Sequence, residues 1–136
     1  MPKTVVIIDD DPDDLDVMKE ALLQVDSSIH CICFIYPEEA LRLLGKELIL
    51  LPDFIFVDIN MVKLSGDFCL RELRKLPEFA ETPIIMCSTS MPEQVAGALL
   101  RDGATHTFQK PFVIKEYIRI LEGILYGSYP RGAAIT

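Results

Sequence analysis

The chain has 136 residues, half of them hydrophobic, with 21 acidic against 13 basic side chains and a formal net charge of -8. This length fits one domain with a substantial core, and the acidic balance argues against nucleic acid or an anionic membrane surface as a partner. The apolar runs have the length of strands, so we expect neither a signal peptide nor a membrane span, and we expect a cytoplasmic protein. Four scattered cysteines favour buried thiols over a zinc site.

Strand-length apolar runs alternate with segments of helical spacing along the chain. Strands are predicted at residues 4–8, 31–35, 54–58, 84–87 and 105–109, and helices begin near residues 12, 36, 67, 92 and 113. This alternation is typical of a doubly wound α/β domain, in which helices cover both faces of a five-stranded parallel sheet. Because the fifth strand is more polar than the others, we expect it at an edge. Residues 127–136 are predicted to be a disordered tail.

Acidic residues open the first predicted helix. Asp11 is the expected N-cap, Pro12 suits the first turn, and Asp13 and Asp14 lie near the positive end of the helix dipole. Capping and dipole effects are sufficient reasons for these acids. We therefore assign Asp11, Asp13 and Asp14 a structural role.

Ionisable side chains stand at the ends of three predicted strands. Asp9 and Asp10 follow the first strand, Asp58 ends the third, and Lys110 follows the fifth. In an open parallel sheet the carboxyl ends of the strands meet in one crevice, so these residues can converge on one small ligand. Packing alone does not explain charges at these positions.

The residue types at this crevice suit a magnesium-dependent phosphoryl transfer. Asp9, Asp10 and Asp58 repel one another and raise each other's pKa unless a cation is supplied. Mg²⁺ prefers such oxygen ligands, and the backbone carbonyl of Asn60 is placed to complete the set. A carboxylate oxygen of Asp58 can then attack phosphorus and form an acyl phosphate.

Two further side chains suit the charges of a transferred phosphoryl group. Lys110 offers a point charge, and Ser88, at the end of the fourth predicted strand, offers a hydroxyl. Pro111 favours an extended backbone for Lys110, and the sequence leaves the isomer of their peptide bond open.

Four motifs in chain order resemble the response regulator receiver domains of bacterial two-component signalling. They are the strand and acidic pair at 5–12, the segment from Val57 to Gly66, Ser88, and Gly103-Ala104 followed by Lys110-Pro111-Phe112. The resemblance covers nearly the whole chain. It implies a flavodoxin-like strand order 2-1-3-4-5, with residues 1–126 as the receiver domain and residues 127–136 as a tail without an output domain.

The resemblance also implies roles for the crevice. Asp58 would accept a phosphoryl group from a histidine kinase or a histidine phosphotransfer protein, Asp9 and Asp10 would hold Mg²⁺, and Ser88 and Lys110 would contact the phosphoryl group. Such a stand-alone module is not a classical enzyme, but it catalyses its own phosphorylation and dephosphorylation. It signals by a conformational change or passes the group on in a relay. A downstream protein or a homodimer partner would meet the surface of the fourth helix, fifth strand and fifth helix.

Three positions depart from the pattern of the family. Thr107 stands where receivers commonly carry an aromatic switch residue, and strand alternation points the neighbouring Phe108 to the opposite face. Val62 replaces a frequent proline, and Thr89 replaces a frequent small residue after Ser88. These changes predict altered coupling between the site and the output surface, and altered transfer or hydrolysis rates.

The sequence leaves other functions open. A pseudo-receiver that keeps the fold and acts as a constitutive protein-binding module is the main alternative. A small phosphatase would want a second acid near the nucleophile, and Asn60 cannot donate that proton. A flavin carrier is disfavoured because the first loop is acidic where a phosphate cradle would want Gly, Ser or Thr.

Overall fold

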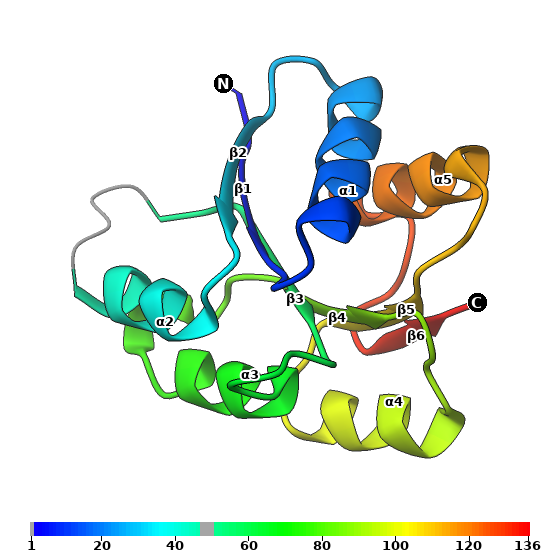
Figure 1. Cartoon of the computed structure of the whole chain (residues 1–136). Coiled ribbons are helices and arrows are strands. Elements are labelled where there is room, and N and C mark those ends of the chain that lie inside the picture. Colours follow the sequence, from blue (N-terminus) through cyan, green and yellow to red (C-terminus); the bar gives the residue numbers. More distant parts are fainter. Residues whose placement is uncertain (1, 47–50) are drawn as a thin grey trace.

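Six strands form a central parallel sheet in the computed structural model, which describes residues 2–46 and 51–136 (Figure 1). They are β1 (Thr4–Ile8), β2 (His30–Phe34), β3 (Phe54–Asp58), β4 (Ile84–Ser88), β5 (His106–Gln109) and β6 (Ala133–Ile135). The order is β2-β1-β3-β4-β5-β6, and every neighbouring pair is parallel. The predicted order 2-1-3-4-5 is confirmed, and β6 extends it.

Helices cover both faces of the sheet, as predicted. They are α1 (Pro12–Val25), α2 (Pro37–Lys46), α3 (Gly66–Arg74), α4 (Glu93–Arg101) and α5 (Ile114–Leu125), with a short 3-10 helix at Pro77–Phe79. α1 and α5 pack on one face, and α2, α3 and α4 pack on the other (Figure 1). Asp11 caps α1, because its carboxylate accepts hydrogen bonds from the N–H groups of Asp13 (2.9 Å) and Asp14 (3.4 Å).

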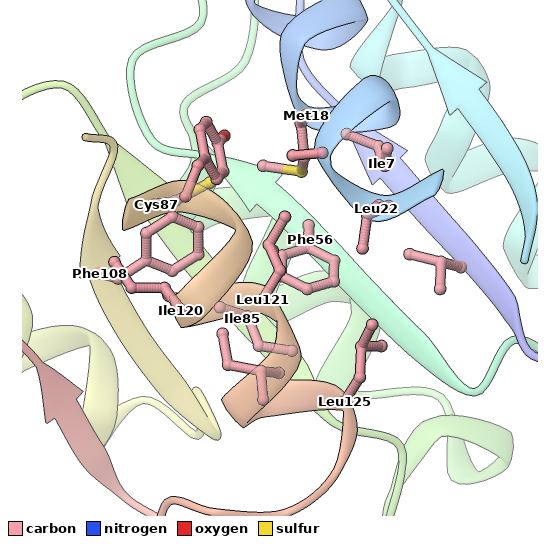
Figure 2. Close-up of a cluster of buried hydrophobic side chains, with 14 of the residues drawn as sticks. Ile7, Met18, Leu22, Phe56, Ile85, Cys87, Phe108, Ile120, Leu121 and Leu125 are labelled. Atoms are coloured by element: carbon pink, nitrogen blue, oxygen red, sulfur yellow. The ribbon is translucent and has the colours of Figure 1, made fainter. Parts of the chain in front are cut away.

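The core beneath α1 and α5 is built around aromatic side chains of the sheet (Figure 2). Phe56 and Phe108 meet edge to face with ring centroids 6.4 Å apart, and Tyr117 of α5 meets Phe108 in the same way at 6.0 Å. Thr107 pairs with Met86, whose side chain belongs to the core on the opposite face. The predicted orientation of Phe108 away from the Thr107 face is therefore confirmed.

Two predictions about the end of the chain are wrong, because β6 pairs with β5. The tail is not disordered, and β5 is not an edge strand. Gly127 and Gly132 have positive φ angles of 73° and 82°, which glycine adopts readily, and they turn the chain after α5 back to the sheet. The Gly132 N–H donates to Thr105 O at 2.8 Å, and Ile135 is 7% exposed. Burial of the apolar Ile135 side chain stabilises the docking of this short strand on the sheet.

The cysteines agree in part with their predicted role as buried thiols. Cys69 and Cys87 are buried, whereas Cys31 and Cys33 on β2 are half-buried. Burial raises the pKa of the Cys69 thiol to about 11, which makes it unreactive near neutral pH. Among the described residues, no helix is both long and apolar enough to cross a membrane.

Candidate functional site

Hydrogen bonds of the sheet fix two aspartates at the carboxyl ends of β1 and β3. Asp58 is the last residue of β3, and the next N–H, that of Ile59, donates to Cys87 O at 3.0 Å. Asp9 follows β1, and its N–H donates to Phe34 O at 3.0 Å. Both backbones are thus held by the sheet on two neighbouring strands, and both side chains are buried. This placement is the one expected for parallel strands that share a rim.

Asp10 joins these two residues to form an acidic cluster. One carboxylate oxygen from each of Asp9, Asp10 and Asp58 lies within 4.8 Å of the others. Asp10 Oδ2 accepts a hydrogen bond from the Val62 N–H at 2.8 Å, and Asp9 Oδ1 accepts one from the Asp11 N–H at 3.0 Å. A set of three carboxylates with fixed oxygens suits a hard divalent cation such as Mg²⁺.

Lys110 brings a positive charge into the cluster from the end of β5. Its backbone N–H donates to Ser88 O at 2.7 Å, its peptide bond to Pro111 is trans, and its side chain is 5% exposed. Its Nζ lies 2.6 Å from Asp9 Oδ2, 3.1 Å from Asp58 Oδ1 and 3.3 Å from Asp14 Oδ2. Three carboxylates therefore surround one buried ammonium group.

Burial and the Lys110 ammonium group have opposite effects on the pKa values of Asp9 and Asp58. Burial raises the pKa of both Asp9 and Asp58 above the ordinary value, and Lys110 opposes that rise by pairing with the ionised forms. Burial would also lower the pKa of Lys110, but Cys87 and the surrounding carboxylates more than offset it and raise that pKa. Lys110 thus stays a cation throughout the physiological pH range.

Ser88 is held beside the cluster by bonds to its neighbours. Its side chain is buried, and its Oγ accepts hydrogen bonds from Asn60 Nδ2 at 2.8 Å and from the Ser90 N–H at 3.3 Å. The structure thus joins the segment after β3 to the segment after β4 through one hydroxyl. A ligand that drew this hydroxyl toward Asp58 would lengthen both bonds.

Comparison with known families gives a match over most of the chain. The model of the response regulator receiver domain matches residues 5–122. The chain belongs to this family. Receiver domains are phosphorylated by histidine kinases and generally bind Mg²⁺ at an acidic cluster.

Individual relatives agree with this assignment. The probable C4-dicarboxylate response regulator DctR of Bacillus subtilis is 29% identical over 118 residues, which are 87% of this chain and 50% of DctR. This receiver therefore spans about half the length of that relative. The fold also matches the phosphorylated cyanobacterial phytochrome response regulator RcpA, with a TM-score of 0.81, 23% identity and 91% of both chains covered. The Mn²⁺-bound form of response regulator Rcp1 matches with a TM-score of 0.77 and 21% identity, covering 90% of this chain and 91% of Rcp1.

The departures from the family pattern have distinct surroundings in this receiver. Thr107 is buried, and its Oγ1 has no hydrogen-bond partner among the described residues. Val62 is 93% exposed beside the acidic cluster, and its backbone N–H donates to Asp10 Oδ2. Thr89 is exposed and lines a hollow with Asp14 and Lys110.

Sequence reasoning missed the contact of Asp14 with Lys110. Asp14 lies in the first turn of α1, where capping and dipole effects already account for an acid, so the sequence carried no signal for a second role. In the structure its carboxylate shares Lys110 with Asp9 and Asp58, and its negative charge contributes to the raised pKa of Asp58. Asp14 is thus an additional member of the candidate site.

Replacing Asp14 with asparagine is expected to speed phosphoryl transfer to this receiver from acetyl phosphate by about threefold, because one negative charge near Asp58 is removed. Added salt should shrink this effect, since the Asp14 side chain is 40% exposed. Asp13→Asn is the matched control, because Asp13 lies in the same helical turn and is exposed. Equal rates for the two variants, measured by intact mass against time, would show that the contact with Lys110 has no role.

Proposed function

We propose that this receiver accepts a phosphoryl group on Asp58 from a histidine kinase or a histidine phosphotransfer protein, in a Mg²⁺-dependent reaction. One observation carries the proposal: the buried Asp58 carboxylate lies 3.1 Å from the ammonium group of Lys110 and within one acidic cluster with Asp9 and Asp10. A nucleophile, a cation and a set of metal ligands are thus present at one rim of the sheet.

Each side chain has a defined part in the transfer. A carboxylate oxygen of Asp58 attacks phosphorus, an O–P bond forms, and the P–N bond to the donor imidazole breaks, with the electron pair leaving on nitrogen. Lys110 stays paired with the negative charge that moves from the carboxylate to the phosphoryl oxygens. The Ser88 hydroxyl donates a hydrogen bond to one of these oxygens, and the movement of Ser88 Oγ toward the phosphoryl group lengthens the bonds that Oγ accepts from Asn60 and from the Ser90 N–H.

The residues of the cluster fit the metal. Asp9, Asp10 and Asp58 would hold Mg²⁺, together with the backbone carbonyl of Asn60, and the donor atoms are all oxygen. When bound, Mg²⁺ neutralises carboxylate charge and polarises the phosphoryl oxygens. The Mn²⁺-bound form of Rcp1 supports a divalent cation for this fold, and the phosphorylated form of RcpA supports phosphoryl acceptance.

The direct test is intact mass after incubation with acetyl phosphate, with and without Mg²⁺. A phosphoryl adduct is expected on the wild type only when Mg²⁺ is present, and no adduct is expected on Asp58→Asn. Asp53→Asn, at an exposed aspartate before β3, is the control that should keep the adduct. An adduct of equal yield on Asp58→Asn would overturn the proposal.

A second function is favoured by one observation, the small Thr107 side chain in place of an aromatic residue. A pseudo-receiver would act as a constitutive protein-binding module and would take up no phosphoryl group. Absence of the adduct from a folded protein that binds no Mg²⁺ would decide for the pseudo-receiver.

The proposed phosphoacceptor is not a classical enzyme, because the only phosphoryl group whose transfer and hydrolysis it catalyses is its own.

Mg²⁺ is expected to stabilise this receiver more at about pH 7.5 than at about pH 5. Since the folded-state pKa values of Asp9 and Asp58 lie above those of the unfolded chain, the stability linked to their protonation is present below the unfolded-state values and is lost as pH rises through the folded-state values. A cation that binds the ionised carboxylates offsets this loss. Thermal unfolding with Mg²⁺ or with EDTA at both pH values measures the difference, and an equal shift at both would contradict it.

The partner surface requires one revision. A homodimer or a downstream protein was expected to meet α4, β5 and α5, but β6 lies along the free side of β5. We propose that any partner at this surface meets β6 together with α4 and α5, or replaces β6.

A further inference from the structure

The C-terminal segment, residues 127–136, is bound to its own receiver by specific contacts. β6 runs parallel to β5 and packs against α4, and Figure 1 shows it at the end of the sheet (red). Ile135 enters the same core as Phe108 and Ile120. The segment therefore occupies the free edge of β5 that partner strands would otherwise reach.

Tyr129 fixes this segment on α5. Gly123 lies in the last turn of α5, and a Cβ there would sit 2.9 Å from Tyr129 Cζ and closer still to Tyr129 Cε2. The ring of Tyr129 also meets that of His106 edge to face at 6.1 Å, and the Ser128 N–H donates to Gly123 O at 2.8 Å. Glycine costs a helix about 1 kcal/mol relative to alanine, and at this position it makes room for the Tyr129 ring.

An apolar groove links this segment to the loop after β4. The groove is lined by Met91 near the end of that loop, by Ala96 and Leu100 of α4, and by Ala134 and Ile135 of β6. Met91 follows Ser90, whose N–H is bonded to Ser88 Oγ. A movement of Ser88 toward Asp58 would break that bond and shift the loop that forms one wall of the groove.

Thr107 fits the same arrangement. It faces α4 from β5, its register partner on β6 is Ala134, and both side chains are small. A large aromatic side chain at position 107 would compete for the space that α4 and β6 share. The small residue at position 107, where receivers commonly carry an aromatic one, is therefore compatible with the additional strand β6 beside β5.

We propose that β6 is a phosphorylation-sensitive cover of the α4–β5 edge: a phosphoryl group on Asp58 weakens the docking of residues 127–136. This inference rests on the proposed function, because it requires a group at Asp58 that draws Ser88 away from Ser90. Coupling of this kind is reciprocal, so weaker docking of β6 also strengthens ligand binding at Asp58.

The experiment uses beryllium fluoride with Mg²⁺, which forms a stable analogue of an aspartyl phosphate. Hydrogen exchange of the amides of residues 133–135 is expected to become about tenfold faster when the analogue is bound. His106 gives an independent signal. Burial beneath β6 holds the pKa of its imidazole below the ordinary value, and that pKa should rise in NMR titrations when the analogue binds, while the exposed His30 provides a reference signal.

Gly123→Ala tests the reciprocal effect. The new methyl group displaces the Tyr129 ring while it favours the helical backbone, so α5 is expected to stay folded. This variant should show fast exchange at 133–135 without the analogue, and it should bind the analogue up to about tenfold more tightly. Gly45→Ala in α2, where a Cβ meets only Leu76 Cδ1 (3.7 Å) among the residues that the structure describes, is the matched control and should behave as the wild type. Ile135→Asp, which places a charge in the core, is a second route to the same release.

The outcomes separate this inference from the proposed function. Fluorine NMR reports whether the analogue is bound at Asp58. If no analogue binds to the wild type, the proposed function fails and this coupling fails with it. If the analogue binds while exchange at 133–135 and the titration of His106 stay unchanged, the proposed function stands and the coupling is wrong. Unchanged affinity in both released variants would also overturn it.

Discussion

Replacing Lys110 with methionine is expected to slow phosphoryl transfer to Asp58 by about 100-fold. The methionine side chain keeps much of the length and the apolar stem of lysine but removes the ammonium group that lies 2.6 Å from Asp9 and 3.1 Å from Asp58. The transferred group would then carry its negative charge among three carboxylates without this cation. The rate is measured by intact mass against time with acetyl phosphate and saturating Mg²⁺.

The same change is expected to cost the metal-free protein about 3 kcal/mol of stability near neutral pH, because buried carboxylates lose their partner. Mg²⁺ should restore a large part of this loss, since it supplies positive charge to the same cluster. Lys115→Met, at an exposed lysine of α5, is the control for removal of a positive charge. A Lys110→Met protein that is folded in Mg²⁺ and transfers at the wild-type rate would show that Lys110 does not act on the phosphoryl group.

Gly66→Ala is expected to destabilise this receiver by about 3 kcal/mol, because the new Cβ has no space. It would lie 2.6 Å from Ile59 Cα and in direct contact with the carbonyl oxygen of Asp58, and both are backbone atoms. The Gly66 N–H also donates to Ile59 O at 2.9 Å, which keeps this approach close. Relief of the clash must therefore move the backbone of Asp58 itself.

Urea unfolding measures this loss, and Gly45→Ala provides the comparison. Gly45 is also a helical glycine, and its variant should be neutral or more stable by up to about 1 kcal/mol. Phosphoryl uptake by Gly66→Ala should fall as well, even in conditions where the protein is fully folded. Equal stability of the two alanine variants would mean that the segment after β3 can move freely away from Gly66.

Residues at strand ends were predictable because one rule of parallel sheets places them. Asp9 and Asp58 follow or end an apolar run, Lys110 follows a more polar strand, and the parallel sheet brings these strand ends to one rim. Val57 to Gly66 and the final Lys-Pro pair added spacing that matched a family. The fold class, the order of the first five strands and the family are therefore readable from the sequence.

Contacts that depend on how a helix packs against the sheet, or on the path of the chain after it, were not predictable. Ala133–Ile135 is a short run beside Gly132 with no alternation of polar and apolar residues, and it becomes a strand only because α5 brings it back to β5. Asp14 and Lys110 are 96 residues apart, and the packing of α1 on the sheet brings their side chains to 3.3 Å. Local sequence propensity carries no information on the pairing of β6 with β5 or on the contact between Asp14 and Lys110.

The chemical identity of the phosphorylated residue is the most direct test of the central claim. After reaction with acetyl phosphate and Mg²⁺, the protein is reduced with borohydride, which converts an aspartyl phosphate to homoserine, and the peptides are sequenced by mass spectrometry. The site predicts homoserine at position 58 and none at Asp9 or Asp10. Homoserine at another position, or a phosphoryl group that survives reduction on a serine, threonine or histidine, would contradict it.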